Sequence, residues 1–495
     1  MSFDPVAKIF HAMPREDRRY PLLGTAVLVV AVLFAAMAVL GHGFLPPDDA
    51  LRHAAQAVCK KPWHEILVLA KPMLFDFHAG WTWLLHRLAD AGLSAEDLVC
   101  FSYVFFFLAV LLPPVFLARR SEAWGIAVIV AVTLGLLSPV RLMLGRPFLS
   151  QVSVMLMMGF LFDTFKRKEF PKTAGAVLFA AMTLSLWFRC GWLLFIIPLG
   201  CLLVAGEWRV FWRMTLIWGV ACLVAATLCR DWSGFFIHST TGLLGSVGRD
   251  LPSWALVSEL VPATPPFLAL LPILFFLAIR FFLKDKLLHR LRDPLLILTL
   301  AGWVLMLQSS RFWGDFGLPA LMVWMTKEFS DLLDRIPGLR GDGKGRFVLC
   351  SVVGGIVFLL ISTDVNGRWG RGNYQLHADY TNEDIQDLFP DEGGIFYNTD
   401  MTFFYQTFFH NPDGHWKYNL GMEAALMPDD NRQIYHNLIL YNKDTRLYQG
   451  YIDKMTSKDR LVILGAGQPG IPELEWNLLQ TGIWSGRLPR EAPSR

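Results

Sequence analysis

The sequence predicts an α-helical polytopic membrane protein that carries a small α/β domain at its C-terminal end. Three observations predict this fold class. Of the 495 residues, 54% are hydrophobic and 18% are charged, whereas a soluble protein carries about a quarter charged residues. Long apolar runs recur up to residue 363 and give the chain a mean hydropathy of +0.40. From residue 364 onward the composition turns polar.

Eleven apolar segments are candidate membrane spans, because about 20 apolar residues in a helix cross the hydrocarbon core. They cover residues 21–41, 99–118, 123–141, 147–164, 173–188, 191–206, 211–229, 265–283, 294–309, 312–327 and 347–363. Several are short for a straight span, which suits re-entrant or partly buried segments. The first follows a polar, basic N-terminus and has no small-residue cleavage pattern, so we interpret it as an uncleaved span.

The Lys and Arg residues predict the orientation. With the N-terminus in the cytoplasm, every inner segment is basic and the longer outer segments are poorer in Lys and Arg, as expected for cytoplasmic loops. Residues 1–363 then form the transmembrane domain, and residues 364–495 form a soluble extracytoplasmic domain. We expect an integral protein of the bacterial inner (plasma) membrane, with this domain in the periplasm.

Two long outer loops and the C-terminal domain have predictable local structure. In the outer loop 42–98, residues 47–60 and 79–90 read as amphipathic helices that lie along the membrane surface. The outer loop 230–264 is rich in Gly and Ser and is predicted to be mobile. In the C-terminal domain the pattern predicts strands over 393–400 and 459–467 and helices over 382–389 and 427–440. The aromatic stretch 396–409 suits either the domain core or a surface resting on the membrane.

The acidic pair Asp48-Asp49, just beyond the outer end of the first span, is the leading candidate for catalysis. Taken alone, an Asp after Pro is more simply a helix N-cap, and an acidic residue suits a first helical turn. The same loop adds cationic and titratable neighbours, which are Arg52, His53, Lys71, Asp76 and His78. A carboxylate among cations suits a site that deprotonates a hydroxyl beside a phosphate, and such general-base help is typically worth about 10²–10⁴ in rate.

Arginines at the outer ends of the spans are the second candidate group. They are Arg141, Arg146, Arg189, Arg230 and Arg311. A guanidinium fork matches phosphate oxygens in pairs, so a cluster of them could hold a lipid-linked phosphate or diphosphate. For any single one, snorkelling to lipid headgroups is the simpler interpretation, and Arg311 is spaced to pair locally with Asp315.

An acidic residue soon after the first span, followed by surface helices and a His-containing segment, resembles the GT-C superfamily of membrane glycosyltransferases. In its protein mannosyltransferase and aminoarabinose transferase branches, the first loop carries an acidic pair and later a His-Pro-Pro-Leu segment. Asp48-Asp49 and His78-Ala79-Gly80-Trp81 stand in these places here, although the prolines of the second motif are missing. The resemblance covers the topology of roughly the first seven spans and these short motifs.

The resemblance implies a GT-C type glycosyltransferase, with inverting hexosyl or pentosyl transfer from a polyprenyl-phosphate donor to a glycan, lipid or protein acceptor. Asp48 or Asp49 would be the general base, and the outer arginines would bind the leaving phosphate. No cofactor is required, because a phosphate leaves once its charge is countered; a divalent cation is optional, and no metal site is indicated by the seven cysteines. Besides the two substrates we expect membrane lipids as partners and, at a net charge of +3, no nucleic acid.

Two other functions fit parts of the same pattern. In a transporter or flippase of a lipid-linked or anionic substrate, the arginines would line a path and the aspartates would couple protons. The polar residues gather at outer ends, however, whereas transporter sites usually lie near mid-span. An O-antigen-ligase-like enzyme also joins lipid-linked glycans with outer arginines, but its main loop lies late in the chain, and here the acidic loop comes first.

Overall fold

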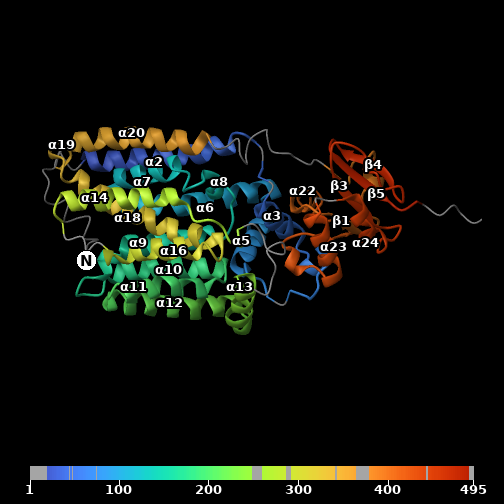
Figure 1. Cartoon of the computed structure of the whole chain (residues 1–495), viewed down its shortest axis with the longest axis horizontal. Coiled ribbons are helices and arrows are strands. Elements are labelled where there is room, and N and C mark those ends of the chain that lie inside the picture. The colour runs from blue at the N-terminus through green and yellow to red at the C-terminus, as the bar shows by residue number, and fades with distance from the viewer. Residues whose placement is uncertain are drawn as a thin grey trace, which may run out of the picture.

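The computed structural model consists of an elongated helical bundle with an α/β domain at one end (Figure 1). The structure describes residues 19–43, 45–46, 48–73, 75–247, 259–285, 291–340, 343–363, 378–441 and 444–489. Part of the outer loop predicted to be mobile, residues 248–258, lies outside the described residues, as do the basic residues Arg15 and Arg18.

Helices occupy the ranges predicted as spans. They are α2 (Arg19–Leu40), α6 (Ala95–Leu117), α7 (Ser121–Thr133), α9 (Leu149–Phe165), α10 (Lys172–Phe188), α11 (Ile196–Val204), α12 (Trp208–Cys229), α14 (Leu270–Phe282), α16 (Pro294–Leu305), α18 (Leu318–Leu333) and α20 (Gly343–Thr363). Among the described helices, α2, α6, α12 and α20 are long and apolar enough to cross a membrane. The apolar helices are those of an integral membrane protein, and the count of eleven crossings stays a prediction.

The predicted span over 123–141 ends early, at Thr133. Gly135 follows at φ +67°, a conformation that ends a helix readily only with glycine. The chain then runs through the short helix α8 (Pro139–Leu142) to Gly145, also at positive φ, where an added Cβ would lie 3.0 Å from the backbone nitrogen of Tyr103. Residues 134–148 therefore form a loop held against α6.

The described parts of the segments predicted to be cytoplasmic lie together at the end of the bundle opposite the α/β domain, near α19 (Pro337–Arg340) (Figure 1). Arg280 is buried there and pairs with Glu328 at 2.7 Å and with Asp285 and Asp331 at 2.8 Å. A buried guanidinium is tolerated only with such partners. The ion pairs join α14 to α18, and thus join two segments that are predicted to be cytoplasmic.

The C-terminal domain is a five-stranded mixed sheet with helices. Its elements are β1 (Ile395–Tyr397), α22 (Met401–His410), β2 (Lys417–Tyr418), α23 (Asp429–Leu440), α24 (Gln449–Ile452), β3 (Arg460–Leu464), β4 (Glu475–Gln480) and β5 (Ile483–Arg487). The sheet order is β2-β1-β3-β5-β4, in which β1 is parallel to β2 and β3, and β5 is antiparallel to β3 and β4.

The predicted elements of this domain are mostly confirmed. Strands β1 and β3 and helix α23 lie where the sequence pattern placed them. The helix expected over 382–389 shrinks to one 3₁₀ turn, Gln386–Leu388. The aromatic stretch 396–409 contains α22, whose side chains from Phe403 to Phe409 are buried, so it belongs to the domain core.

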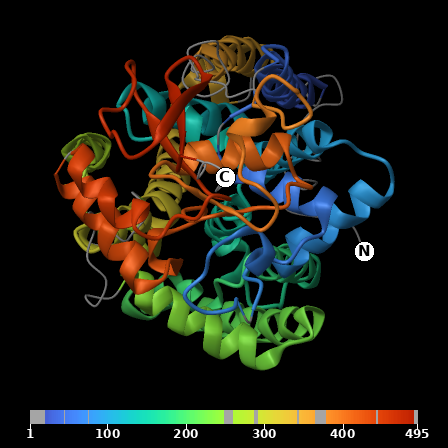
Figure 2. The ribbon, with the colours of Figure 1, turned by 90° about the vertical axis from the view of Figure 1, so that its right-hand side faces the viewer.

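The first outer loop lies between the bundle and the C-terminal domain. Its helices α3 (Asp49–Cys59) and α5 (Ala79–Asp90) confirm the two predicted there. The expected position of the first on the membrane surface is wrong, because α3 packs against α6 on the bundle and against α22 of the domain. All its residues from Ala50 to Ala57 are buried. Figure 2, which looks onto the C-terminal domain, shows the first loop beside it.

Close packing between α7 and α20 makes one position sensitive. A Cβ on Gly125 would overlap Cγ1 of Val353, whose β-branched side chain turns only with difficulty in a helix. We expect Gly125→Ala to lower stability by about 1–3 kcal/mol through overpacking, measured as a lower thermal unfolding midpoint in detergent. The control is Gly355→Ala on α20, where the added Cβ has nothing within 4 Å. Equal midpoints for the two variants would contradict this packing.

Candidate active site

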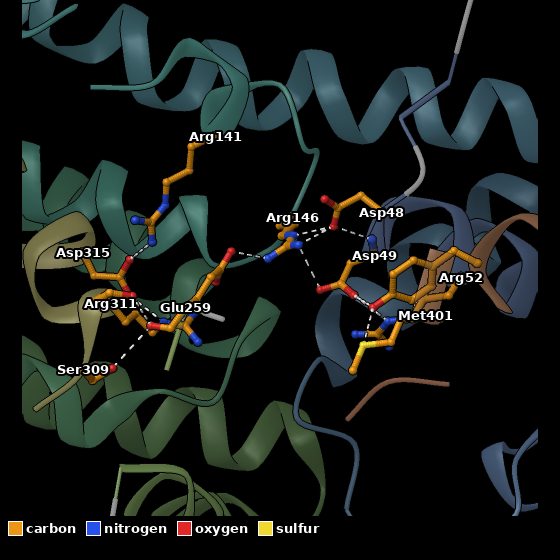
Figure 3. Close-up of polar contacts among 12 residues, drawn as sticks. Asp48, Asp49, Arg52, Arg141, Arg146, Glu259, Ser309, Arg311, Asp315 and Met401 are labelled. Carbon is orange, nitrogen blue, oxygen red and sulfur yellow. Dashed lines mark hydrogen bonds and ion pairs between the residues drawn. The ribbon is translucent and has the colours of Figure 1, made fainter. Parts of the chain in front are cut away.

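The acidic pair stands at the start of α3, where the two carboxylates have different surroundings (Figure 3). Asp48 accepts a hydrogen bond from the backbone N of Asp49, so its interpretation as an N-cap is correct. It is 1% exposed, and Nε of Arg146 donates to its Oδ1 at 2.6 Å. A buried carboxylate needs such a counter-charge. Asp48 is therefore held by the backbone at the start of α3 and by the guanidinium of Arg146.

Asp49 is more accessible than Asp48, with 25% of its side chain exposed against 2%. Its Oδ1 accepts hydrogen bonds from Nε of Arg52 and from the hydroxyl of Tyr405, both at 3.0 Å, and its Oδ2 lies 3.7 Å from Nε of Arg146. Burial opposes ionisation, but Arg52 and Arg146 outweigh it and hold the pKa of Asp49 well below its usual range. Asp49 is thus an ionised, reachable carboxylate at neutral pH.

Three of the predicted arginines surround one aromatic ring. The guanidinium carbons of Arg141, Arg311 and Arg189 lie 4.9, 5.4 and 5.9 Å from the ring centroid of Phe148. Asp315 accepts from Arg141 at 2.8 Å and from Arg311 at 2.7 Å (Figure 3). The local Arg311–Asp315 pair is therefore confirmed, and a second arginine shares it. Three guanidinium groups to one carboxylate leave this arginine group electropositive.

The protonation of Arg189 fits that charge excess. Burial and the neighbouring Arg311 lower its pKa to about 9. At neutral pH it still carries a positive charge, which an anion at this place would stabilise. Arg146 has the opposite surroundings: burial works against its charge, but Asp49, Asp48 and Glu259 raise its pKa above the usual range.

Glu259 connects the acidic pair to the segment that carries Arg311. Its carboxylate pairs with Nη1 of Arg146 at 2.5 Å, and its backbone carbonyl accepts from the hydroxyl of Ser310 at 2.7 Å. Figure 3 shows Glu259 between the two groups. The first loop, the 134–148 loop, the segment before α14 and the hydroxyl of Ser310 on α17 (Ser310–Phe312) are thus joined by polar contacts.

A glycine makes room for this network. Gly314 lies in the π-helical turn Trp313–Gly317 that leads into α18, and a Cβ there would overlap the guanidinium of Arg141. Only a glycine lets Arg141 reach Asp315 across this turn. The π-turn itself contains two glycines, Gly314 and Gly317, and such turns recur at functional sites.

The remaining predicted residues divide into two groups. His53 on α3 and His78 lie beside the acidic pair, with ring centroids 5.0 Å apart. Asp76 accepts from the backbone N of His78 at 2.8 Å and so shapes the turn before α5. Lys71 and Arg230 are exposed, the latter at the end of α12 with φ +57°, and within the described chain neither contacts the network.

Several residues of the site were missed by sequence reasoning. Tyr405 and Glu423 come from the C-terminal domain, and burial together with Asp49 raises the pKa of Glu423. Glu259 lies in an outer loop that composition singled out only as mobile, and Phe148 reads as one apolar residue among many. Within the described ranges, no group of three or more His, Cys, Asp or Glu residues is placed to hold a metal ion.

Comparison with known proteins decides the fold. No family model matches the chain, and neither does any curated protein sequence. The apo oligosaccharyltransferase of Archaeoglobus fulgidus matches with a TM-score of 0.53 and 11% identity, over 89% of this chain and 69% of that one. The oligosaccharyltransferase AglB of Archaeoglobus fulgidus, in complex with an inhibitory peptide and a dolichol-phosphate, matches with a TM-score of 0.54 and 12% identity, over 88% of this chain and 69% of that one. The chain has a GT-C fold.

A mycobacterial arabinofuranosyltransferase, AftD, is also similar, with a TM-score of 0.39 and 18% identity over 75% of this chain and 30% of that one, which is too low to carry an argument. The resemblance to the GT-C superfamily is confirmed at the level of the fold. Assignment to the mannosyltransferase and aminoarabinose transferase branches stays a prediction.

The buried histidine next to the acidic pair predicts acid sensitivity. Burial and then Arg52 lower the pKa of His53 to about 3, whereas an unfolded histidine titrates near about 6.5. As the pH falls from about 6.5 towards 3, His53 binds a proton in the unfolded chain but not in the folded chain. The free energy of unfolding therefore decreases across this pH range. We expect the thermal unfolding midpoint to fall in that range and to fall less steeply in His53→Gln. The control is His64→Gln, a substitution of an exposed histidine; equal slopes in wild type and His53→Gln would contradict the assignment.

Proposed function

We propose that the protein transfers a sugar from a polyprenyl-phosphate donor to an acceptor hydroxyl at the outer membrane face, inverting the anomeric centre. One observation carries the proposal: the accessible carboxylate of Asp49 lies 3.7 Å from Arg146, and Arg146 is joined through Glu259 to Ser310, the residue before Arg311 of the arginine group at Phe148. Glycosyl transfer needs a base for the incoming hydroxyl and positive charge for the departing phosphate. The GT-C fold supports the same reaction class.

Asp49 is the better general base of the pair. Asp48 is almost fully buried, caps α3 and is held by Arg146, so its role is to fix the helix start and the arginine. Oδ2 of Asp49 would accept the proton of the acceptor hydroxyl. The low pKa of Asp49 makes it a weak base in the resting protein. A donor phosphate that attracts Arg146 would weaken this hold and make the carboxylate more basic when the donor is bound.

The arginine group would bind the phosphate. Arg141 and Arg311 are oriented by Asp315, and Arg189 adds a charge from a third segment. In the transfer step, the acceptor oxygen forms a bond to the anomeric carbon while the bond from that carbon to the phosphate oxygen breaks. The phosphate leaves with the electron pair, and the arginines stabilise its added charge. A contribution of Arg230 stays a prediction.

The membrane orientation and the acceptor complete the proposal. We place the N-terminus in the cytoplasm of a bacterium and the C-terminal domain in the periplasm, so that a glycan, lipid or protein acceptor approaches from there. The dolichol-phosphate in the complex of the archaeal neighbour supports a lipid-phosphate donor for this chain. A divalent cation is compatible with this chemistry but is not required by it.

Substitution of the acidic pair tests the base. We expect Asp49→Asn to lower sugar transfer from a polyprenyl-phosphate donor in detergent by about 10²–10⁴-fold, because an amide cannot accept the proton. Asp48→Asn should lower the thermal unfolding midpoint and affect transfer less. The control is Asp90→Asn at the exposed end of α5. Full transfer by both Asp49→Asn and Asp48→Asn would show the general-base assignment to be wrong. Movement of lipid-linked substrate across vesicles without any transfer would favour a transporter.

Substitution of the arginine group tests the phosphate site. We expect Arg189→Ala and Arg311→Ala each to lower kcat/KM for the donor by roughly 10–150-fold, the value of a charge-assisted hydrogen bond. Arg311→Lys should recover only part of the lost kcat/KM, because an ammonium lacks the planar fork of a guanidinium. Arg87→Ala, a change of an exposed arginine on α5 that packs on Trp83, serves as the control. Donor kinetics of Arg189→Ala equal to those of Arg87→Ala would remove Arg189 from the site.

A further inference from the structure

The C-terminal domain reaches the acidic pair through one side chain. Tyr405 lies on α22, is 8% exposed, and donates its hydroxyl hydrogen to Oδ1 of Asp49 at 3.0 Å. Apart from His410 at its last position, the other aromatic side chains of this helix are phenylalanines, which pack but cannot donate. Tyr405 therefore places the one phenolic hydroxyl of α22 on the carboxylate that we assign as the base.

The domain is fixed on both sides of that contact. Nη1 of Arg52, the other donor to Asp49, also lies 3.1 Å from Sδ of Met422 in the domain. Farther along the first loop, the backbone N of Val68 donates to the carbonyl of Tyr418 at 3.0 Å, and that of Ala70 donates to Leu426 at 2.9 Å. The first of these bonds extends the edge of the sheet at β2, and the second joins the loop to the segment that follows.

Backbone contact between the loop and the domain is tight. A Cβ on Gly421 would overlap Cδ2 of Leu67, so the domain segment after β2 lies directly on the first loop. Leu67 also forms an isolated parallel bridge with Tyr418. The position of α22 over α3 is therefore determined by the backbone at one end and by Tyr405 at the other.

We propose that the C-terminal domain is part of the catalytic unit and that Tyr405 is a positioning residue, which holds Oδ1 of Asp49 so that Oδ2 faces the acceptor hydroxyl. The inference rests on the proposed function. Oδ1 is occupied by two donors, Arg52 and Tyr405, that come from different domains. Oδ2 lies 3.7 Å from Nε of Arg146, beyond hydrogen-bond distance, so this oxygen can accept the hydroxyl proton. A carboxylate held in this way needs no rotation before it accepts the proton.

A simpler account is that Asp49 merely satisfies a buried phenol. Buried tyrosine hydroxyls usually find a partner, and burial followed by Asp49 raises the pKa of Tyr405 well above its usual range, which keeps it a donor. The two accounts differ in what the hydroxyl does to Asp49. A hydrogen bond to the charged form favours that form, so a positioning role shifts the pH at which Asp49 titrates during turnover.

The experiment compares Tyr405→Phe with Tyr435→Phe in the full-length protein in detergent. Tyr435 is a buried tyrosine on α23 in the same domain, and its hydroxyl does not contact Asp49. We expect Tyr405→Phe to lower kcat/KM roughly tenfold and to move the acid limb of its pH profile about one unit to higher pH. Tyr435→Phe should leave the acid limb in place. In an Asp49→Asn background, Tyr405→Phe should cause no further loss.

A second variant keeps the test valid if Tyr405→Phe does not fold. Incorporation of 3-fluorotyrosine at position 405 retains the shape and the hydroxyl but makes the phenol a stronger donor, so the acid limb should move to lower pH. The proposal is overturned if Asp49→Asn is inactive while both Tyr405 variants show the wild-type acid limb. Full transfer by Asp49→Asn would instead overturn the assignment of Asp49 as the base. An absence of transfer by the wild type would overturn both the proposed function and the proposed role of Tyr405.

Discussion

The ion pairs of Arg146 are the interaction on which the site depends. This guanidinium contacts Asp48, Asp49 and Glu259, which come from the first loop and from a segment more than 200 residues later. Carboxylates this close would repel one another and lose their charge without a shared cation. Arg146 can take that position because Gly145 lets the backbone lie against α6. The packing of the bundle therefore determines the charge state of the acidic pair.

Charge is distributed unevenly across this network. Around Arg146 the carboxylates outnumber the guanidinium, whereas around Phe148 three guanidinium groups share Asp315. The carboxylates around Arg146 thus favour a proton or a hydroxyl donor, and the guanidinium groups around Phe148 favour an anion. A reaction that moves a proton one way and negative charge the other way is matched by this gradient, because both charge shifts are stabilised by groups already in place. The polarity of the site therefore follows from which charged side chains gather around Arg146 and which gather around Phe148.

Residue type and topology were sufficient to predict much of this arrangement. Asp48, Asp49 and the outer arginines carry formal charge next to apolar runs, and orientation from the basic segments put them at the same end of the bundle. Tyr405 could not be predicted, since it contacts Asp49 across 356 positions of sequence and looks like one aromatic residue in an aromatic run. The burial of α3 was missed for a related reason: its pattern describes an amphipathic helix, and the cover that buries its other face belongs to a distant segment.

The backbone pairing of the first loop with the sheet edge has a consequence for how the molecule is made. Val68 and Ala70 bond to residues that are synthesised some 350 positions later, so α3 has no cover on its domain side until nearly the whole polypeptide exists. Contacts between such distant segments close slowly because the chain entropy of the long loop must be lost first. The fold of the protein is thus completed only when the C-terminal domain packs on the first loop, and a truncated product would leave an alanine-rich helix exposed to chaperones and proteases.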